Sequence, residues 1–357
     1  MKNNTPFLNE VKSLQDNKYD KIPKSSSLQD LRWLIAQNTI EIISDDLPLE
    51  PAVSICMITY NHHQFIKDAL EGVIAQKTTF EIELIVSDDC STDGTQDILL
   101  DYQKIYPNLI RVLLAKKNQG QLTPNKNAPF MPNVIRAIDY CRGKYIALCE
   151  GDDYWIDSLK LQKQVDFLEA NEDYSLCFHN AKIQFMRSGN FREWIMHESL
   201  DKTIFETKDL LRGWFIPTAS IMARNYGVSM IPEWFHHCQS GDITLLLLWS
   251  LRGKIKYLNE VMSVYRLHDN GITASANHSG YNKVISMMFL YQSFNIDTKY
   301  KYNDEIMIAI ISEINTHLPE IKELKAEVEK FKAELTFLKV KHKIKNLIKK
   351  YFLHKFT

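Results

Sequence analysis

Short apolar runs alternate with amphipathic segments through the first half of the chain. Four runs rich in β-branched and aliphatic residues predict buried strands: VSICMIT (53–59), IELIVS (82–87), IRVLLA (110–115) and YIALC (145–149). Apolar residues recur at helical spacing in the segments between or after them: HQFIKDALEGVIAQ, TQDILLDYQKIY and DSLKLQKQVDFLEA. This alternation predicts an α/β fold with a doubly wound sheet.

The rest of the chain divides into further segments. Residues 1–50 begin with a polar stretch and continue into a predicted helix, SLQDLRWLIAQNTIEIIS. Beyond residue 175 the alternation weakens, and we expect a strand, a loop opening into a buried helix, and a second strand: TASIMARN, SGDITLLLLWSLRGK and KYLNEVMSVYRLHDNG. The predicted parts are an N-terminal extension, a main domain, a helical segment and an appendage: 1–50, 51–275, 276–317 and 318–357.

Composition and charge narrow the class of protein. The chain has 357 residues, 45% of them hydrophobic, which is enough for one large core with appendages. A formal net charge of −1 gives no overall reason to expect a nucleic-acid partner. The cysteines form no CxxC pair, and the chain shows neither a signal-like N-terminus nor an apolar run of about 18 residues. These features predict a cytoplasmic protein with reduced thiols and no membrane span.

The loops after the four predicted strands hold the polar residues of interest. In a doubly wound sheet, ligands bind outside the carboxyl ends of the strands, so these loops should meet at one edge. In chain order they read TYNHH, DDCSTDGT, AKKNQGQLTPNKNAPFMPN and EGDDYW. The first loop has no GxGxxG and the chain has no GxxxxGK[ST], which argues against a dinucleotide site and a P-loop.

Asp152 and Asp153 directly follow a buried strand, where paired acids cost stability unless a cation or ligand compensates. Hard oxygen ligands at a strand end suit Mg²⁺ or Mn²⁺ held partly by the phosphates of a ligand, and a solvated turn is the alternative. DDCSTDGT matches half of an EF-hand loop, but Leu100 stands where a bidentate Glu is required, so we exclude a calcium loop. Asp93 is therefore predicted to be a turn residue.

Asp242 is a lone acid at the start of the apolar helix in SGDITLLLLWS. Considered alone, it is most simply interpreted as an N-cap. The nearby His236, His237 and Cys238 are adjacent rather than spaced as zinc ligands, and no partner pair follows them. We expect no metal site there.

Taken in order, these motifs resemble those of the inverting glycosyltransferases of family 2, which have the GT-A fold. The resemblance covers residues 51–275 and rests on five segments: VSICMITYNH, IELIVSDDCSTDGT, GKYIALCEGDDYW, SGD before a helix, and YRLHDNG. It implies a Rossmann-like mixed sheet flanked by helices, with a helical C-terminal appendage. It also implies that the donor is bound by Thr59, Tyr60, Asn61, Asp89 and Asp152.

The resemblance implies individual roles as well. Tyr60 would stack on the nucleotide base, Asp89 would bind the base and Asp152 would contact the ribose. Asp153 would hold Mn²⁺ or Mg²⁺ on the donor diphosphate, and His268 would join the metal or the leaving phosphate. Asp242 would be the general base. The chemistry agrees, because a cation stabilises the departing diphosphate and the acceptor hydroxyl needs a base on the opposite face.

The appendage has two patterns of its own. Apolar residues from Ile321 to Leu338 recur every three or four positions, which fits a homodimeric coiled coil through 318–340 or a helix packed on the same chain. Residues 339–357 carry seven lysines and no acid, interleaved with apolar side chains. This composition favours peripheral contact with the inner face of an anionic cytoplasmic membrane over nucleic acid.

The sequence therefore predicts a metal-dependent inverting glycosyltransferase. It would move a sugar from a UDP-linked donor to a hydroxyl of a growing or lipid-linked glycan in surface polysaccharide or lipo-oligosaccharide synthesis. A sugar nucleotidyltransferase is one alternative, but it would need a Gly-rich phosphate loop and basic residues, and TYNHHQF supplies neither. The other is a module that binds a nucleotide sugar without turnover.

Overall fold

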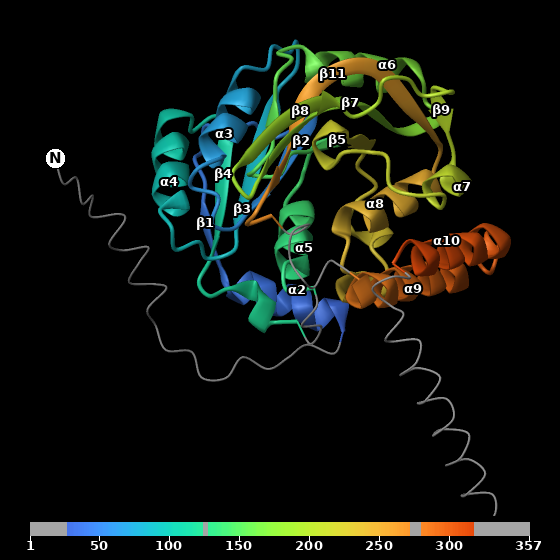
Figure 1. Ribbon diagram of the computed structural model, residues 1–357. Helices are drawn as coiled ribbons and strands as arrows, with labels where there is room; N and C mark the ends of the chain where they lie inside the picture. The colour runs from blue at the N-terminus through green and yellow to red at the C-terminus, as the bar shows by residue number, and fades with distance from the viewer. Residues whose placement is uncertain (1–26, 124–127, 272–279, 318–357) are drawn as a thin grey trace, which may run out of the picture.

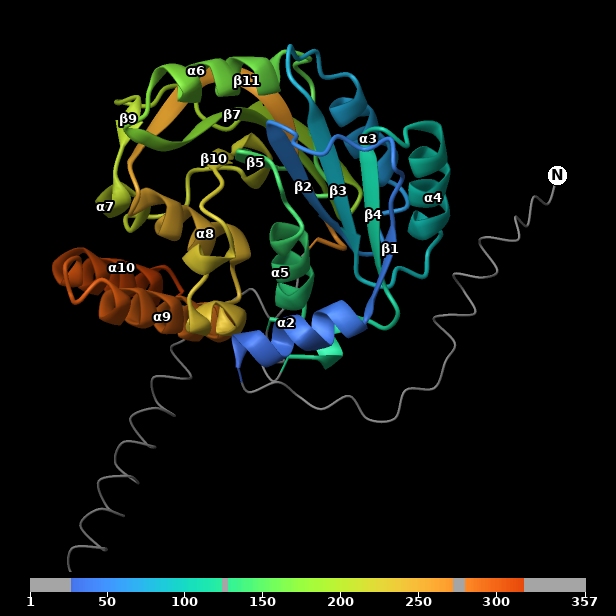
Figure 2. The ribbon, with the colours of Figure 1, turned by 180° about the vertical axis from the view of Figure 1, so that it is seen from behind.

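The computed structural model describes residues 27–123, 128–271 and 280–317, which form a mixed sheet with helices on both faces (Figures 1 and 2). Its strands are β1 Thr39–Ile42, β2 Val53–Thr59, β3 Ile82–Asp88, β4 Ile110–Ala115, β5 Tyr145–Leu148, β6 Tyr154–Trp155, β7 Tyr174–Arg187, β8 Asn190–Ile195, β9 Ile204–Phe205, β10 Met222–Arg224 and β11 Lys254–His268. They lie in the order β1-β4-β3-β2-β5-β10-β7-β11-β6, with β8 beside β7 and β9 beside β11. The predicted α/β fold is confirmed.

The helices lie on two sides of this sheet. They are α2 Leu28–Gln37, α3 Ile66–Ile74, α4 Thr95–Ile105, α5 Met131–Asp139, α6 Lys160–Ala170, α7 Thr207–Leu210, α8 Gly241–Ser250, α9 Gly280–Asp297 and α10 Asn303–Thr316. Helices α3, α4 and α6 share one apolar core with the sheet, and α2, α5 and α8 share a second (Figure 2). Each of the three helices predicted beside the first strands is present, as α3, α4 and α6.

The four predicted strands, β2, β3, β4 and β5, form one parallel group in the sheet. β2 pairs in parallel with β3 and β5, and β3 pairs in parallel with β4. Because parallel strands have their carboxyl ends at one edge, the loops that follow them meet there. All four strands are buried along most of their length, as the apolar runs predict.

The helix predicted over residues 27–44 is too long. Ser27 caps α2, and the chain leaves the helix at Asn38 to form β1, antiparallel to β4. The segment Thr39–Ile42 alternates β-branched residues with Glu41, a pattern that suits an edge strand better than a helix. The Arg111 side chain on β4 binds Glu41 across the strand pair, so tertiary pairing decides the structure.

The second half of the sheet is built on a long strand pair. β7 and β11 run parallel from Lys254 opposite Tyr174 to His268 opposite Met186, with bulges on the way. The predicted strand over KYLNEVMSVYRLH is β11, and TASIMARN gives only the short β10 because Thr218–Ser220 is a 3₁₀ turn. The segment predicted as helical over 277–317 contains α9 and α10. The coiled-coil and basic patterns of 318–357 lie outside the described residues.

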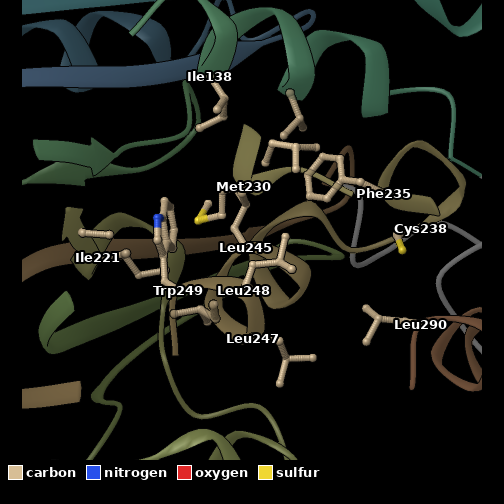
Figure 3. Close-up of a cluster of buried hydrophobic side chains, with 14 of the residues drawn as sticks. Ile138, Ile221, Met230, Phe235, Cys238, Leu245, Leu247, Leu248, Trp249 and Leu290 are labelled. Carbon is tan, nitrogen blue, oxygen red and sulfur yellow. The ribbon is translucent and has the colours of Figure 1, made fainter. Parts of the chain in front are cut away.

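Helix α8 lies between the sheet and the α9–α10 pair. Its side chains from Thr244 to Ser250 are all buried, which explains its uniformly apolar sequence. Figure 3 shows Leu245, Leu247, Leu248 and Trp249 among side chains from α5, α9 and the segment before α8. Within the described ranges, no helix combines the length and apolar character needed to cross a bilayer.

A buried ion pair at the opposite edge of the sheet allows a test of the fold. Glu83 on β3 is fully buried and binds Arg142 through Oε2 at 2.5 Å. Because Arg142→Met leaves this carboxylate without its cation, we expect the free energy of unfolding to fall by about 3 kcal/mol. Lys144→Met removes only an exposed pair with Glu169 and should cost less than about 1 kcal/mol. Equal losses for the two variants in urea titrations would contradict this account.

Candidate active site

The loops after β2, β3 and β5 are joined to one another at the carboxyl edge. The N–H of Asp89 donates to the Thr59 carbonyl at 3.0 Å, and the N–H of Gly151 donates to the Ile58 carbonyl at 2.9 Å. A Cβ added at Gly151 would lie 2.7 Å from Thr59 Oγ1, so only glycine allows this approach. The loops that the sequence predicted to meet therefore do so.

Asp152 faces two histidines. Its Oδ2 lies 3.1 Å from His268 Nε2 at the end of β11 and 3.7 Å from His62 Nε2 in the loop after β2. Burial raises the pKa of Asp152, but the two imidazoles outweigh this and leave the pKa below its ordinary value. Sequence reasoning identified Asp152 and His268 but missed His62, although TYNHH places it in the first strand-end loop.

Asp153 is turned into the protein instead. Asp153 is only 1% exposed, and its carboxylate Oδ1 accepts the backbone N–H of Arg266 at 2.8 Å. Its Oδ2 has no partner among the described residues, and burial raises its pKa well above the ordinary value. His268, expected to act with Asp153, contacts Asp152. The metal role of Asp153 stays a prediction.

Asp89, the residue expected to bind the base, also holds the third strand-end loop. Its Oδ1 accepts the backbone N–H of Gln119 at 2.6 Å, and its Oδ2 accepts Asn118 Nδ2 at 3.0 Å. Burial raises the pKa of Asp89 to about 7. The fully buried Arg136 of α5 donates through Nη2 to the carbonyl of Asp88 at 2.6 Å, which fixes the end of β3.

The donor residues expected at the end of β2 differ in exposure. Thr59 is buried, and its Oγ1 has no hydrogen-bond partner in the described part of the chain. Tyr60 is 47% exposed, as a side chain that stacks on a ligand needs to be. Asn61 has a φ of 55°, and its Oδ1 accepts the Thr92 N–H at 2.8 Å, which joins the first loop to the second.

Asp93 is a turn residue, as the sequence predicts. Its Oδ1 accepts the N–H of Thr95 at 3.0 Å, and its Oδ2 accepts the N–H of His63 at 2.9 Å. Gly94 follows with a φ of 95° and begins α4. The segment DDCSTDGT therefore makes a rigid turn.

Asp242 is not the cap of α8. Ser240 occupies the N-cap position, and Asp242 lies in the first turn with its Oδ2 accepting the Thr218 hydroxyl at 3.2 Å. The pKa of Glu150, in the loop after β5, lies well above its ordinary value. Burial is the largest cause, and the negative charges of Asp152, Asp153 and Asp242 add to it. Asp242 is thus an acid near the loop after β5, carried by a separate element, α8.

The residues around Asp152 fit a divalent cation. No three His, Cys, Asp or Glu side chains in the described ranges are grouped to hold a metal by themselves, so a cation here would need ligand oxygens as well. Asp152 Oδ2 and His268 Nε2, 3.1 Å apart, are a carboxylate oxygen and an imidazole nitrogen that would both be donors to such a cation. In the segment before α8, the His236 and His237 rings contact each other at 3.9 Å between centroids.

The chain is similar to several known proteins, most of them glycosyltransferases. Residues 54–229 match the family model described as glycosyl transferase family 2. An uncharacterized protein of Mycobacterium tuberculosis, Rv1520, is 34% identical over 236 residues, which are 63% of this chain and 61% of that protein. The chain thus spans about three fifths of that relative's length. The UDP-Glc:α-D-GlcNAc-diphosphoundecaprenol β-1,3-glucosyltransferase WfaP of Escherichia coli is 28% identical over 226 residues, 62% of this chain and 80% of that one.

A solved structure shares the fold. TarS of Staphylococcus aureus in complex with UDP-GlcNAc superposes with a TM-score of 0.55 at 18% identity. The match covers 74% of this chain and 72% of the TarS 1–349 chain in that structure. At this identity the likeness concerns the fold alone.

Proposed function

Because the chain belongs to glycosyltransferase family 2 through residues 54–229 and has the GT-A fold, we propose that it is an inverting glycosyltransferase of bacterial glycan synthesis. The donor is a nucleoside diphosphate sugar, UDP-linked as in the names of WfaP and of the TarS complex. The acceptor is a hydroxyl of a growing or lipid-linked glycan. The observation on which this rests is the division of the carboxylates into two centres, Asp152 with its histidines and Asp242 on α8.

Asp152 and His268 would hold Mn²⁺ or Mg²⁺ at the donor diphosphate. Such an ion, when bound, stabilises the negative charge that develops on the leaving diphosphate. His62, 3.7 Å from Asp152, orients the carboxylate from the other side. Asp153 holds the loop against β11 through the Arg266 N–H.

The base end of the donor would lie between Tyr60 and Asp89. Tyr60 has the exposed ring that can stack on a pyrimidine, and Asp89 positions the third loop beside it. Thr59 and Asn61 set the path of the first loop, and the buried Thr59 hydroxyl is one polar group that a ligand could satisfy.

Asp242 would accept the proton of the acceptor hydroxyl. Displacement with inversion requires a base on the face of the sugar opposite the leaving diphosphate, and Asp242 is carried by α8, an element separate from the Asp152 loop. The Thr218 hydroxyl holds Asp242 Oδ2 at 3.2 Å and so fixes the orientation of the base.

The proposed activity is tested by a thermal-shift screen of UDP, UDP-glucose and UDP-N-acetylglucosamine with Mn²⁺. A ligand that binds only the folded chain raises its melting temperature, and we expect that rise to disappear with a chelator. UDP release from the donor that binds then separates an enzyme from a binding module. A melting shift without any release would favour the module, and no shift with any of the three compounds would contradict the donor assignment.

Membrane contact through residues 339–357 and a homodimer through 318–340 stay predictions, since both segments lie outside the described residues. The basic and apolar side chains of 339–357 predict binding to an anionic surface. Deleting 339–357 should therefore release the protein from phosphatidylglycerol vesicles in a sedimentation assay while UDP binding stays unchanged. Equal sedimentation of the deleted and full chains would place the contact elsewhere.

A further inference from the structure

Two exposed tryptophans flank a row of apolar side chains on the sheet. Trp214, in the loop between α7 and α8, is 45% exposed, and its ring lies 5.8 Å from that of Tyr265 on β11. Tyr265 is the strand neighbour of Ile183 on β7, which is the strand neighbour of Trp194 on β8. Trp194 is 46% exposed. Paired residues of neighbouring strands point to the same face, so Tyr265, Ile183 and Trp194 lie in one row, and the Trp214 ring extends it through Tyr265. We call these four residues the aromatic strip; Ile183 is only 4% exposed, so the exposed rings of the strip are those of the two tryptophans.

This strip lies on the Asp242 side of β11. Arg266 and His268 point to the face where Asp152 and Asp68 lie. Successive side chains of a strand alternate, so Tyr265 points to the opposite face, toward Trp214. The loop that presents Trp214 continues directly to Thr218, whose hydroxyl binds Asp242. The strip and the candidate base are therefore joined by four residues of chain.

A cavity continues from the strip toward α8. Its lining includes Trp214, the α8 residues Ile243 and Leu246, and Lys283 of α9. Ile243 directly follows Asp242. The loop itself is held in place, because His197 Nε2 lies 2.7 Å from the Phe215 carbonyl. An exposed tryptophan on a fixed loop beside a cavity has the geometry of a binding surface rather than of a flexible tip.

From this arrangement we infer that the aromatic strip binds the pyranose rings of an acceptor glycan, with Trp214 under the ring nearest Asp242 and Trp194 under a ring further along the chain. This inference rests on the proposed function and extends it to the acceptor. Flat aromatic faces suit the apolar C–H faces of a pyranose, and they add binding without selecting one pattern of hydroxyls. Neighbouring strands lie about 4.8 Å apart, so β8 and β11 are separated by about 10 Å, enough for more than one ring. The acceptor is accordingly an oligosaccharide.

The test is saturation-transfer NMR with methyl β-glucoside and with cellotetraose, each measured in the presence of UDP and Mn²⁺. β-Linked glucose carries all its ring C–H bonds axial and is therefore a general probe of stacking. We expect cellotetraose to bind more tightly than the monomer. Trp214→Ala should weaken the binding of both probes about 10-fold, and Trp194→Ala should weaken only that of cellotetraose. Trp214→Phe should retain most of the affinity. The matched control is Trp33→Ala, since Trp33 is 61% exposed on α2, away from the strip.

Three outcomes would contradict the inference that the aromatic strip binds pyranose rings. They are wild-type affinity for both probes in Trp214→Ala, a loss in Trp33→Ala as large as that in Trp214→Ala, and no binding of either probe to the wild-type chain. Calorimetry of UDP with Mn²⁺ on the same samples keeps this test separate from the proposed function. If Trp214→Ala keeps the UDP affinity of the wild type but binds the glucosides more weakly, the inference about the strip is supported. If the wild type does not bind UDP at all, the proposed function is contradicted, and the glucoside measurements alone then test the strip.

Discussion

Replacement of Asp242 by Asn should lower the rate of sugar transfer by about 10²–10⁴-fold, the usual contribution of a positioned general base. Asn keeps the size of the side chain and can still accept the Thr218 hydroxyl, but it cannot take the proton of the acceptor. Donor affinity should stay unchanged, because the donor residues lie on other loops. The measurement is the transfer rate together with calorimetry of UDP and Mn²⁺.

The structure makes this variant informative about stability as well. Ser240, not Asp242, occupies the N-cap of α8, so Asp242→Asn should leave the melting temperature nearly unchanged. Thr218→Val is the matched comparison: it removes the hydroxyl that orients the carboxylate but keeps the base, so it should lower the transfer rate much less than Asp242→Asn does. Near wild-type transfer by Asp242→Asn would exclude it as the base. An early melt with lost donor binding would show that the residue is structural.

Replacement of Asp152 by Asn should weaken the binding of UDP in Mn²⁺ by more than about 100-fold. Changing a residue that only supports a metal ligand typically costs 10–100-fold in metal affinity, so loss of the ligand itself should cost at least as much. Asp153→Asn should have a much smaller effect, because the amide oxygen can still accept the Arg266 N–H. The two variants make the same Asp-to-Asn change at adjacent positions, so each serves as the control of the other.

The chelator separates metal binding from general damage. Without metal, wild type and Asp152→Asn should bind UDP with equal, weak affinity. If Asp153→Asn loses more affinity than Asp152→Asn in Mn²⁺, the metal ligand is Asp153, as the sequence motif alone implies. A loss that persists in the chelator would instead mean that Asp152 contacts the nucleotide directly, in the ribose role expected from the resemblance.

The parallel half of the fold could be predicted because local pattern and tertiary position agree there. Runs such as VSICMIT and IRVLLA are buried on both faces, and amphipathic helices follow at regular intervals. Residues 39–42 were wrongly included in the preceding helix: their β-branched residues suit a strand, and pairing with the edge of β4 and with the Arg111 side chain forms β1. β7 and β8 were missed for a similar reason: polar residues interrupt β7, and every residue of β8 is exposed.

The candidate site was predictable by residue type but not by pairing. The motif places Asp152 and Asp153 side by side, and only the backbone decides which carboxylate faces His268 and which faces the Arg266 N–H. His62 belongs to the site because the loops after β2 and β5 are bound together, a contact between residues about ninety positions apart. Such a contact between distant residues cannot be predicted from their spacing in the sequence. The link from Thr218 to Asp242 was hidden in the same way.

The alternation of side chains along β11 has a consequence for how such an enzyme can be altered. Arg266 and His268 point toward the Asp152 loop, whereas Tyr265 points toward Trp214. A substitution at Tyr265 should therefore change the proposed acceptor binding and leave the proposed cation site untouched. A single inserted or deleted residue between Tyr265 and His268 would exchange the two faces and disable both at once. Variation of acceptor preference should thus proceed by point substitution along this strand, with its length kept constant.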